Sequence, residues 1–255
     1  MTWDEAVLPV HHDGDFSVAV LFIHGFTSTP GSIKDWAEGI HKGLGASMEV
    51  PLLPGHGTTW DKLNTIHWQD WESACLAAFD RLAASGKPVV VGGLSLGGLL
   101  ACLVALRRPV AGLILVNNLM WLDNPALFLA PIIKRLKASI PAIAGDIANP
   151  EIKEPAYSQV ATGGIDQFRR LMKFVRGRLG EITSPLLLFK SRQDHVIPLS
   201  SARRTYHKIG STQKELVWLE RSYHVATLDY DLGLIIEKST RFLQSVASLE
   251  KGNSH

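Results

Sequence analysis

The chain has 255 residues, 46% of them hydrophobic and 20% charged, with a formal net charge of +2. This composition is typical of a globular protein with enough length for one large core or two small ones, and one domain is the simpler interpretation. The small, scattered charge argues against nucleic acid or an anionic membrane as the main partner. Residues 1–16 are acidic and contain no apolar run, so we expect no export signal and a cytoplasmic protein.

Strand-like apolar runs alternate with helical patterns along most of the chain. We predict strands at 18–23, 46–50, 88–93, 111–118, 185–190 and 214–220. Helices are predicted at 68–84 and 232–249, where apolar residues recur three and four positions apart. This alternation predicts an α/β fold in which a mostly parallel sheet carries helices on both faces. Active sites of such sheets lie at the carboxyl ends of the strands.

Residues 89–106, VVVGGLSLGGLLACLVAL, carry no charge and reach the lower length limit of a membrane span. Four glycines around Ser95 indicate instead a strand, a tight turn and a helix from about 99 to 106. Gly93 to Gly97 match G-x-S-x-G, the nucleophile elbow, in which a strained serine presents its hydroxyl above the sheet edge. The alternative is a glycine-rich turn that happens to contain a serine.

A serine nucleophile needs a base and an acid that orients the base, and on this fold they follow in the order Ser, Asp, His. Asp194 follows the predicted strand at 185–190, and His224 follows the last predicted strand. Asp123 is a rival acid because it follows the preceding strand. His195, adjacent to Asp194, is a weaker candidate for the base.

An acyl-transfer site also needs N–H donors that stabilise the oxyanion. The amide of Leu96 comes directly after the nucleophile, and the amide of Phe26 lies in the loop after the first predicted strand, where Gly25 permits the turn. His24 in the same loop is given a structural role. Cys75 and Cys102 are interpreted as buried thiols, and the histidines form no HExxH metal motif.

A gap of about 65 residues, 119–183, interrupts the alternation of strands and helices. A structureless loop of this length is improbable in a compact domain, so we expect an inserted helical cap on a body formed by 1–118 and 184–255. The cap contains nine Lys and Arg against six Asp and Glu. Its apolar residues either seal it onto the body or line a pocket, with Ile143 as a candidate substrate contact; they are Trp121, Leu127, Phe128, Leu129, Ile132, Ile133, Ile140 and Ile143.

Several short motifs together resemble those of the serine α/β-hydrolases. They are HGF at 24–26, PGHG at 54–57, GLSLGG at 93–98, DHVIP at 194–198 and SYHVATLDYD at 222–231. The likeness spans nearly the whole chain and is closest to the bacterial monoacylglycerol lipases and related small carboxylesterases. The elbow alone is shared by many hydrolases. The last motif and the segment NPEIKEPAYS at 149–158 are more specific to the monoacylglycerol lipase group.

The resemblance implies an α/β-hydrolase fold with a triad of Ser95, Asp194 and His224. It also implies that Phe26 and Leu96 supply the oxyanion hole and that the cap covers a pocket for one acyl chain. Glu154 matches a position that keeps a polar contact to glycerol hydroxyls in such enzymes, although the adjacent Pro155 is a departure from the family pattern.

We therefore expect a serine ester hydrolase that cleaves a monoacylglycerol through an acyl-enzyme, with no metal or organic cofactor. A broad short-chain carboxylesterase or a thioesterase is the alternative within enzymes, and a small-ligand receptor on the same fold is the alternative outside them. The expected partner is a small lipid ester. We expect no nucleic acid and no stable membrane insertion, with the cap as the candidate for transient membrane contact; the oligomeric state stays open.

Overall fold

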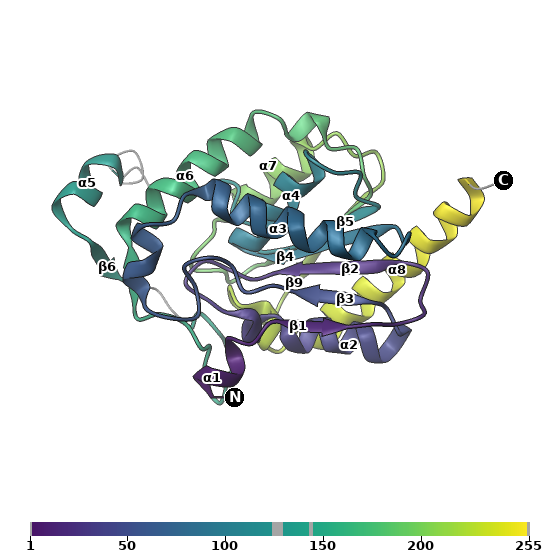
Figure 1. The fold of residues 1–255 in the computed structure, drawn as a ribbon, viewed down its shortest axis with the longest axis horizontal. Coiled ribbons are helices and arrows are strands. Elements are labelled where there is room, and N and C mark those ends of the chain that lie inside the picture. Colours follow the sequence, from purple (N-terminus) through teal and green to yellow (C-terminus); the bar gives the residue numbers. More distant parts are fainter. Residues whose placement is uncertain (1, 124–129, 143–144, 254–255) are drawn as a thin grey trace.

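The computed structural model describes residues 2–123, 130–142 and 145–253. Its centre is a seven-stranded sheet in the order β1-β3-β2-β4-β5-β8-β9 (Figure 1). The strands are β1 (Val10–His12), β2 (Ala19–Ile23), β3 (Met48–Val50), β4 (Val89–Leu94), β5 (Gly112–Val116), β8 (Leu186–Ser191) and β9 (Lys214–Leu219). β1 is antiparallel to β3, and the other neighbouring pairs are parallel. The predicted α/β fold with a mostly parallel sheet is confirmed.

The six predicted strands correspond to β2, β3, β4, β5, β8 and β9, and their ends agree within two residues. The sequence does not predict β1, because its three residues, VHH, are largely polar and form an edge strand without an apolar pattern. The helix after Ser95 begins at Leu96 rather than near Leu99. It begins earlier because the turn between strand and helix is a single residue, Ser95 itself.

Helices cover both faces of the sheet (Figure 1). α2 (Lys34–Leu44) and α8 (Leu232–Asn253) pack on one face. The other face carries α3 (Trp68–Ala83), α4 (Leu96–Ala105), α6 (Thr162–Arg176) and α7 (Leu199–Lys208). Shorter described elements are α1 (Trp3–Ala6), α5 (Ala130–Leu136) and the 3-10 turns η1 (Pro30–Ser32), η2 (Trp60–Asn64), η4 (Leu179–Glu181) and η5 (Ala226–Leu228).

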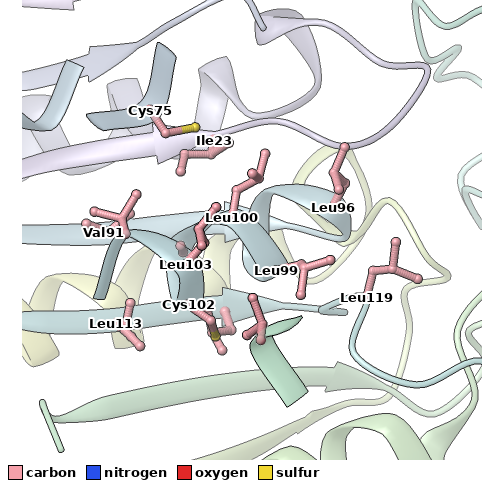
Figure 2. Close-up of a cluster of buried hydrophobic side chains, with 14 of the residues drawn as sticks. Ile23, Cys75, Val91, Leu96, Leu99, Leu100, Cys102, Leu103, Leu113 and Leu119 are labelled. Carbon is pink, nitrogen blue, oxygen red and sulfur yellow. The ribbon is translucent and has the colours of Figure 1, made fainter. Parts of the chain in front are cut away.

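The core consists of two hydrophobic clusters, one on each face of the sheet. Side chains alternate along β2, so Leu21 belongs to one cluster while Val20 and Phe22 belong to the other. Figure 2 shows the first cluster, in which Leu99 and Leu103 of α4 lie against the sheet. A sheet that is buried on both faces explains why its strands have continuous apolar sequences.

Cys75 of α3 and Cys102 of α4 lie in the cluster drawn in Figure 2. Both are free and buried. Burial raises the pKa of both thiols, that of Cys102 to about 12, because a thiolate is disfavoured in apolar surroundings. Both cysteines are therefore packing residues, as the sequence predicts.

Residues 119–183, the insert, join β5 to its neighbour β8. The described elements of the insert are α5, β6 (Ser139–Pro141), β7 (Gln159–Ala161), α6 and η4. β6 and β7 pair as a separate antiparallel sheet, and Figure 1 shows α5 and β6 beyond one end of the central sheet. The insert contacts the body at that end, since the Tyr157 N–H donates to the Thr27 carbonyl at 3.0 Å and the N–H of Trp68, the first residue of α3, donates to Gln167 at 3.2 Å. Among the described helices, none is both long and apolar enough to cross a membrane.

Candidate active site

Ser95 forms the one-residue turn between β4 and α4. Its backbone has φ 55° and ψ −114°, a conformation that non-glycine residues rarely adopt. Neighbouring backbone holds it there, because its N–H donates to the Val116 carbonyl and its own carbonyl accepts the Leu119 N–H, each at 3.0 Å. The turn therefore has the strained backbone geometry of the predicted nucleophile elbow.

The glycines on both sides of Ser95 are sterically required. A Cβ atom on Gly97 would lie 1.9 Å from the carbonyl oxygen of Ile23, and one on Gly93 would lie 2.3 Å from the backbone of Gly97. Both distances are far below any allowed contact, so no side chain fits at either position. The G-x-S-x-G pattern is thus a packing requirement of this strand, turn and helix, as the predicted nucleophile elbow demands.

The structure brings Asp194 and His224 together at the carboxyl ends of β8 and β9. The Nδ1 atom of His224 lies 3.1 Å from each carboxylate oxygen of Asp194. Asp194 Oδ1 also accepts the N–H groups of Val196 and Ile197 at 2.9 and 2.8 Å. Burial by itself would raise the pKa of the Asp194 carboxyl, but His224, Lys190 and the Ile197 N–H hold that pKa well below its usual range.

The rival acid and base lie in surroundings that do not favour them. Asp123 is exposed and binds Ser200 on α7, with Arg204 at 4.0 Å. His195 is also largely exposed, and its Nδ1 lies 2.7 Å from Asp146. The geometry therefore favours Asp194 as the residue that orients the histidine.

The two candidate oxyanion donors belong to segments that lie next to the nucleophile. Leu96 is the first residue of α4, where an N–H has no partner within the helix. Phe26 follows Gly25, and Gly25 lies beside the nucleophile. A Cβ atom built on Gly25 would lie 3.6 Å from the Cβ atom of Ser95. Within the described part of the chain, neither the Phe26 nor the Leu96 N–H donates to a protein acceptor, so both are available to a substrate oxygen.

His24 is a buried structural residue, as expected. Its Nε2 accepts the Leu53 N–H at 3.1 Å, so its Nδ1 carries the proton and donates to the Gly25 carbonyl at 2.9 Å. Burial and the neighbouring His56 hold the pKa of His24 well below its usual value, and burial lowers the pKa of His56 to about 4. Two neutral imidazoles therefore connect the loop after β2 with the loop after β3.

One cavity of about 280 Å³ contains both the nucleophile and the histidine. Most of its wall is apolar, and four polar side chains besides Ser95 and His224 contribute to it. The wall includes Thr27, Ser28, Leu119, Leu122, Ile140, Asp146, Glu154, Val160, Ile165, Phe168, Val196 and Ile197. The body and the insert therefore share the wall.

Of the two substrate contacts predicted in the insert, the structure describes Glu154 but not Ile143. Glu154 lines the cavity, and its Oε2 accepts the Gly145 N–H at 3.2 Å. Ile143 lies outside the described residues, as do 127–129. Ile140, from the same apolar set, lines the cavity, whereas Ile132 on α5 is 56% exposed. The apolar residues of the insert thus do not share one role.

Asp146 is a residue of the site that the sequence does not reveal. It lines the cavity and its Oδ2 accepts the backbone N–H groups of His195 and His224, each at 3.1 Å. Asp229 adds a second connection, because its Oδ2 accepts the N–H of Ala148 in the insert at 2.7 Å and that of Tyr223 at 2.9 Å. The insert is thereby bound directly to the loop that carries His224.

Asn117 is a second site residue without a recognisable sequence signal. It has φ 44° and is fully buried at the end of β5. Its Nδ2 donates to the His224 carbonyl at 2.7 Å and to Ser191 Oγ at 2.9 Å, while its Oδ1 accepts the Ser191 N–H at 2.9 Å. Asn117 therefore connects β5, β8 and the histidine loop, which are far apart in sequence.

The described residues contain no group of three or more His, Cys, Asp or Glu side chains arranged to hold a metal ion. The arrangement of Ser95, His224 and Asp194 is suited to nucleophilic attack by a serine hydroxyl. A neutral histidine oriented by a carboxylate is the base that such an attack requires.

Comparison with known proteins agrees with this geometry. Residues 15–231 match the family described as serine aminopeptidase, S33. The chain is 37% identical over 227 residues to a thermostable monoacylglycerol lipase of Bacillus sp. (strain H-257), covering 88% of this chain and 90% of the relative. It is 24% identical over 235 residues to a carboxylesterase of Bacillus subtilis (strain 168), covering 89% and 93%.

Among solved structures, one from work on LipS and LipT, two metagenome-derived lipolytic enzymes, superimposes with a TM-score of 0.90 and 34% identity. It covers 94% of this chain and 98% of that chain. These matches confirm the resemblance to serine α/β-hydrolases and, among them, to monoacylglycerol lipases. The protein is a member of the serine aminopeptidase S33 family and has the α/β-hydrolase fold.

Proposed function

We propose that this protein is a serine carboxylic ester hydrolase that cleaves monoacylglycerols to a fatty acid and glycerol. The observation that carries the proposal is the convergence of the Ser95 elbow and the His224–Asp194 pair on one cavity. The identity to a monoacylglycerol lipase over most of the chain supports the substrate class.

The proposed reaction has two steps with an acyl-enzyme between them. Ser95 Oγ attacks the ester carbonyl carbon while His224 Nε2 takes the hydroxyl proton and then passes it to the departing glycerol oxygen. Asp194 binds Nδ1–H, which leaves Nε2 free as the base. Water then attacks the acyl-enzyme by the same route and releases the fatty acid.

The negative charge that forms on the carbonyl oxygen needs fixed donors. The N–H groups of Phe26 and Leu96 have this role in the proposal, because they lie beside Ser95 and have no protein acceptor in the described structure. Such donors contribute roughly 3–4 kcal/mol of transition-state stabilisation each in related chemistry. Phe26 is itself held in place by close packing: a Cβ on Gly164 of α6 would lie 2.7 Å from its ring.

The cavity wall supports a substrate with one apolar chain and a polar head. Ile140, Val160 and Phe168 offer apolar surface for an acyl chain. The Glu154 carboxylate, already aligned by the Gly145 N–H, is proposed to accept hydrogen bonds from the glycerol hydroxyls. Glu154 is half-buried, and a triacylglycerol has no free hydroxyl to donate to its carboxylate, so this contact would be lost with that substrate.

We propose further that residues 119–183 act as a cap on a body formed by 1–118 and 184–255. The insert supplies Leu119, Ile140 and Glu154 to the cavity wall, and this supports a role in choosing the substrate. Its helix α5 also carries the exposed side chains of Ile132 and Leu136 beside Lys134 and Arg135. Apolar and basic side chains together suit transient contact with a lipid surface. The cytoplasmic location stays a prediction.

A short-chain carboxylesterase or thioesterase is the second candidate. The modest cavity of about 280 Å³ and the 24% identity to a carboxylesterase favour it. A non-catalytic receptor would have no use for a strained serine beside an oriented histidine. The receptor is therefore the weakest of the three candidates.

A substrate panel tests the proposal. Hydrolysis rates are compared for mono-, di- and triacylglycerols of one medium chain length and for p-nitrophenyl acetate, with Ser95→Ala as the blank. We expect monoacylglycerol to be cleaved fastest and triacylglycerol slowest. If the acetate ester is preferred, the protein is a short-chain carboxylesterase, and if no ester is cleaved above the blank, the proposal is wrong.

A further inference from the structure

Lys190 is a buried lysine whose ammonium group contacts the triad. It lies in β8, between β5 and β9, and its side chain is 1% exposed. Its Nζ donates to Asp194 Oδ2 and, at 2.7 Å, to the Ile197 carbonyl. The two carboxylate oxygens of Asp194 therefore have different partners. Oδ2 binds the Lys190 ammonium, and Oδ1 accepts the backbone N–H groups of Val196 and Ile197.

Stability alone does not explain a lysine at this position. Removing an ammonium and a carboxylate from water is costly, and a buried ion pair is often no more stable than apolar side chains of similar volume. The preceding strand residues Leu188 and Phe189 are apolar and fully buried. The described structure also gives Lys190 only two acceptors, both in the loop that carries Asp194, which connects it with the site rather than with the core.

The charges around Asp194 come from three directions. Lys190 approaches from β8 and His224 from the loop after β9. Burial lowers the pKa of Lys190, and the carboxylates of Asp194 and of Asp146 in the insert oppose that shift. Asp146 in turn binds the ring of His195 at 2.7 Å. The ion pair of Lys190 with Asp194 has no net charge, so the carboxylate that contacts the His224 ring is neutralised, while the Asp146 carboxylate faces the His224 backbone N–H at 3.1 Å.

We propose that Lys190 is a positioning residue of the triad, whose ammonium fixes the Asp194 carboxylate and neutralises its charge so that His224 stays an unprotonated base to lower pH. The inference rests on the proposed function, because it assumes that Asp194 and His224 act with Ser95. Its physical basis is that a lone carboxylate stabilises a neighbouring imidazolium, and a cation on that carboxylate weakens the effect.

Two variants separate charge from hydrogen bonding. Lys190→Met removes both, whereas Lys190→Gln removes the charge and keeps an N–H donor. In both variants the midpoint of the acid limb of the kcat/KM profile should move to higher pH by about one unit, the usual size of a shift caused by a neighbouring charge. On the alkaline side of that midpoint, kcat should fall further in Lys190→Met than in Lys190→Gln.

Lys238→Met is the matched control, because Lys238 of α8 forms an exposed ion pair with Glu215 at 2.9 Å. It should keep the wild-type midpoint. A lysine that only fills space would lower thermal stability or the yield of active protein but would leave the midpoint unchanged. An unchanged midpoint in both Lys190 variants, measured with two different esters, overturns the proposal.

A measurement on the wild-type protein keeps the proposal testable if the variants do not fold. With 15N-labelled lysine, the ammonium signal that is most protected from hydrogen exchange should belong to Lys190 and should shift with the same midpoint as the acid limb. A protected signal that does not change over this range contradicts the coupling. Failure of the proposed function is distinct, because wild type would then lack esterase activity and Ser95 would not react with a fluorophosphonate.

Discussion

The two halves of the cavity wall are built differently. On the body side, Ser95 is held by backbone hydrogen bonds to the ends of neighbouring strands, and close packing leaves room only for glycine at Gly93 and Gly97. On the insert side, side chains such as Ile140 and Glu154 reach the cavity from short elements. The body therefore carries the proposed triad, while the insert presents Ile140 and Glu154 to the cavity and also supports the His224 loop through Asp146.

This difference separates two kinds of variant. Changes on the body side should reduce turnover of every ester, because all substrates share the same acyl transfer. Changes to the insert side chains Ile140 and Glu154, which line the cavity, should alter the ranking of substrates. Parallel effects from both sides would contradict this division.

The largest effect is expected for Ser95→Ala. Loss of the nucleophile should reduce kcat on the order of a millionfold for all esters, while the melting temperature stays close to that of wild type, because alanine keeps the Cβ atom and the same strained backbone. Steady-state kinetics and thermal unfolding measure both. Activity within tenfold of wild type in a folded variant would remove Ser95 from the mechanism.

Asp194→Asn should reduce kcat by roughly ten thousandfold, because an amide favours the wrong histidine tautomer. The loss should again be equal for acetate and long-chain esters. Asp123→Asn is the control, since Asp123 is exposed and bound to Ser200, and it should change kcat little. The opposite ranking of the two variants would assign the acid to Asp123.

Glu154→Gln tests the insert side. It should lower kcat/KM for a monoacylglycerol by about tenfold to a hundredfold, the value of a hydrogen bond to a charged group, and leave a p-nitrophenyl ester of the same chain length nearly unaffected. Glu151→Gln, at an exposed position of the same segment, is the control. Equal losses on both esters would show that Glu154 supports the fold or the reaction rather than glycerol binding.

The smallest effect concerns stability in acid. Burial lowers the pKa of His56 to about 4 from an ordinary value of 6.5, so the unfolded chain binds this proton more readily than the folded one. The contribution of neutral His56 to the free energy of unfolding is fully present above about pH 6.5. As the pH falls towards 4, this contribution decreases by roughly 2–3 kcal/mol. In His56→Gln, this part of the decline should disappear from unfolding curves.

His207→Gln is the control for that measurement, because His207 is exposed on α7. It should keep the acid sensitivity of the wild type. An identical decline in wild type and His56→Gln would show that other groups cause the acid lability, with the buried His24, whose pKa is also lowered, as the next candidate.

Much of the fold could be predicted from the sequence because its signals are local. The apolar runs of β2 and β4 are buried on both faces, and the glycines around Ser95 mark the elbow within five residues. Asp194 and His224 could be predicted because each follows a strand of a parallel sheet, and the carboxyl ends of such strands share one edge.

Other parts could not be predicted because they depend on contacts between distant segments. The strands β6 and β7 have three residues each and pair across 17 intervening residues, from 142 to 158. Asn117, Asp146 and Lys190 owe their positions to partners such as Ser191, His224 and Asp194. In the sequence alone each is one polar residue beside an apolar segment, with nothing to identify its partner.

The most direct test of the proposed acyl-enzyme mechanism is to map the site of covalent modification by a fluorophosphonate. Wild-type protein is incubated with the reagent, weighed intact by mass spectrometry and digested to locate the adduct. We expect one adduct per chain on Ser95, none in Ser95→Ala and a much slower reaction in His224→Ala. An adduct on another residue, or equal labelling of Ser95→Ala, would contradict the mechanism.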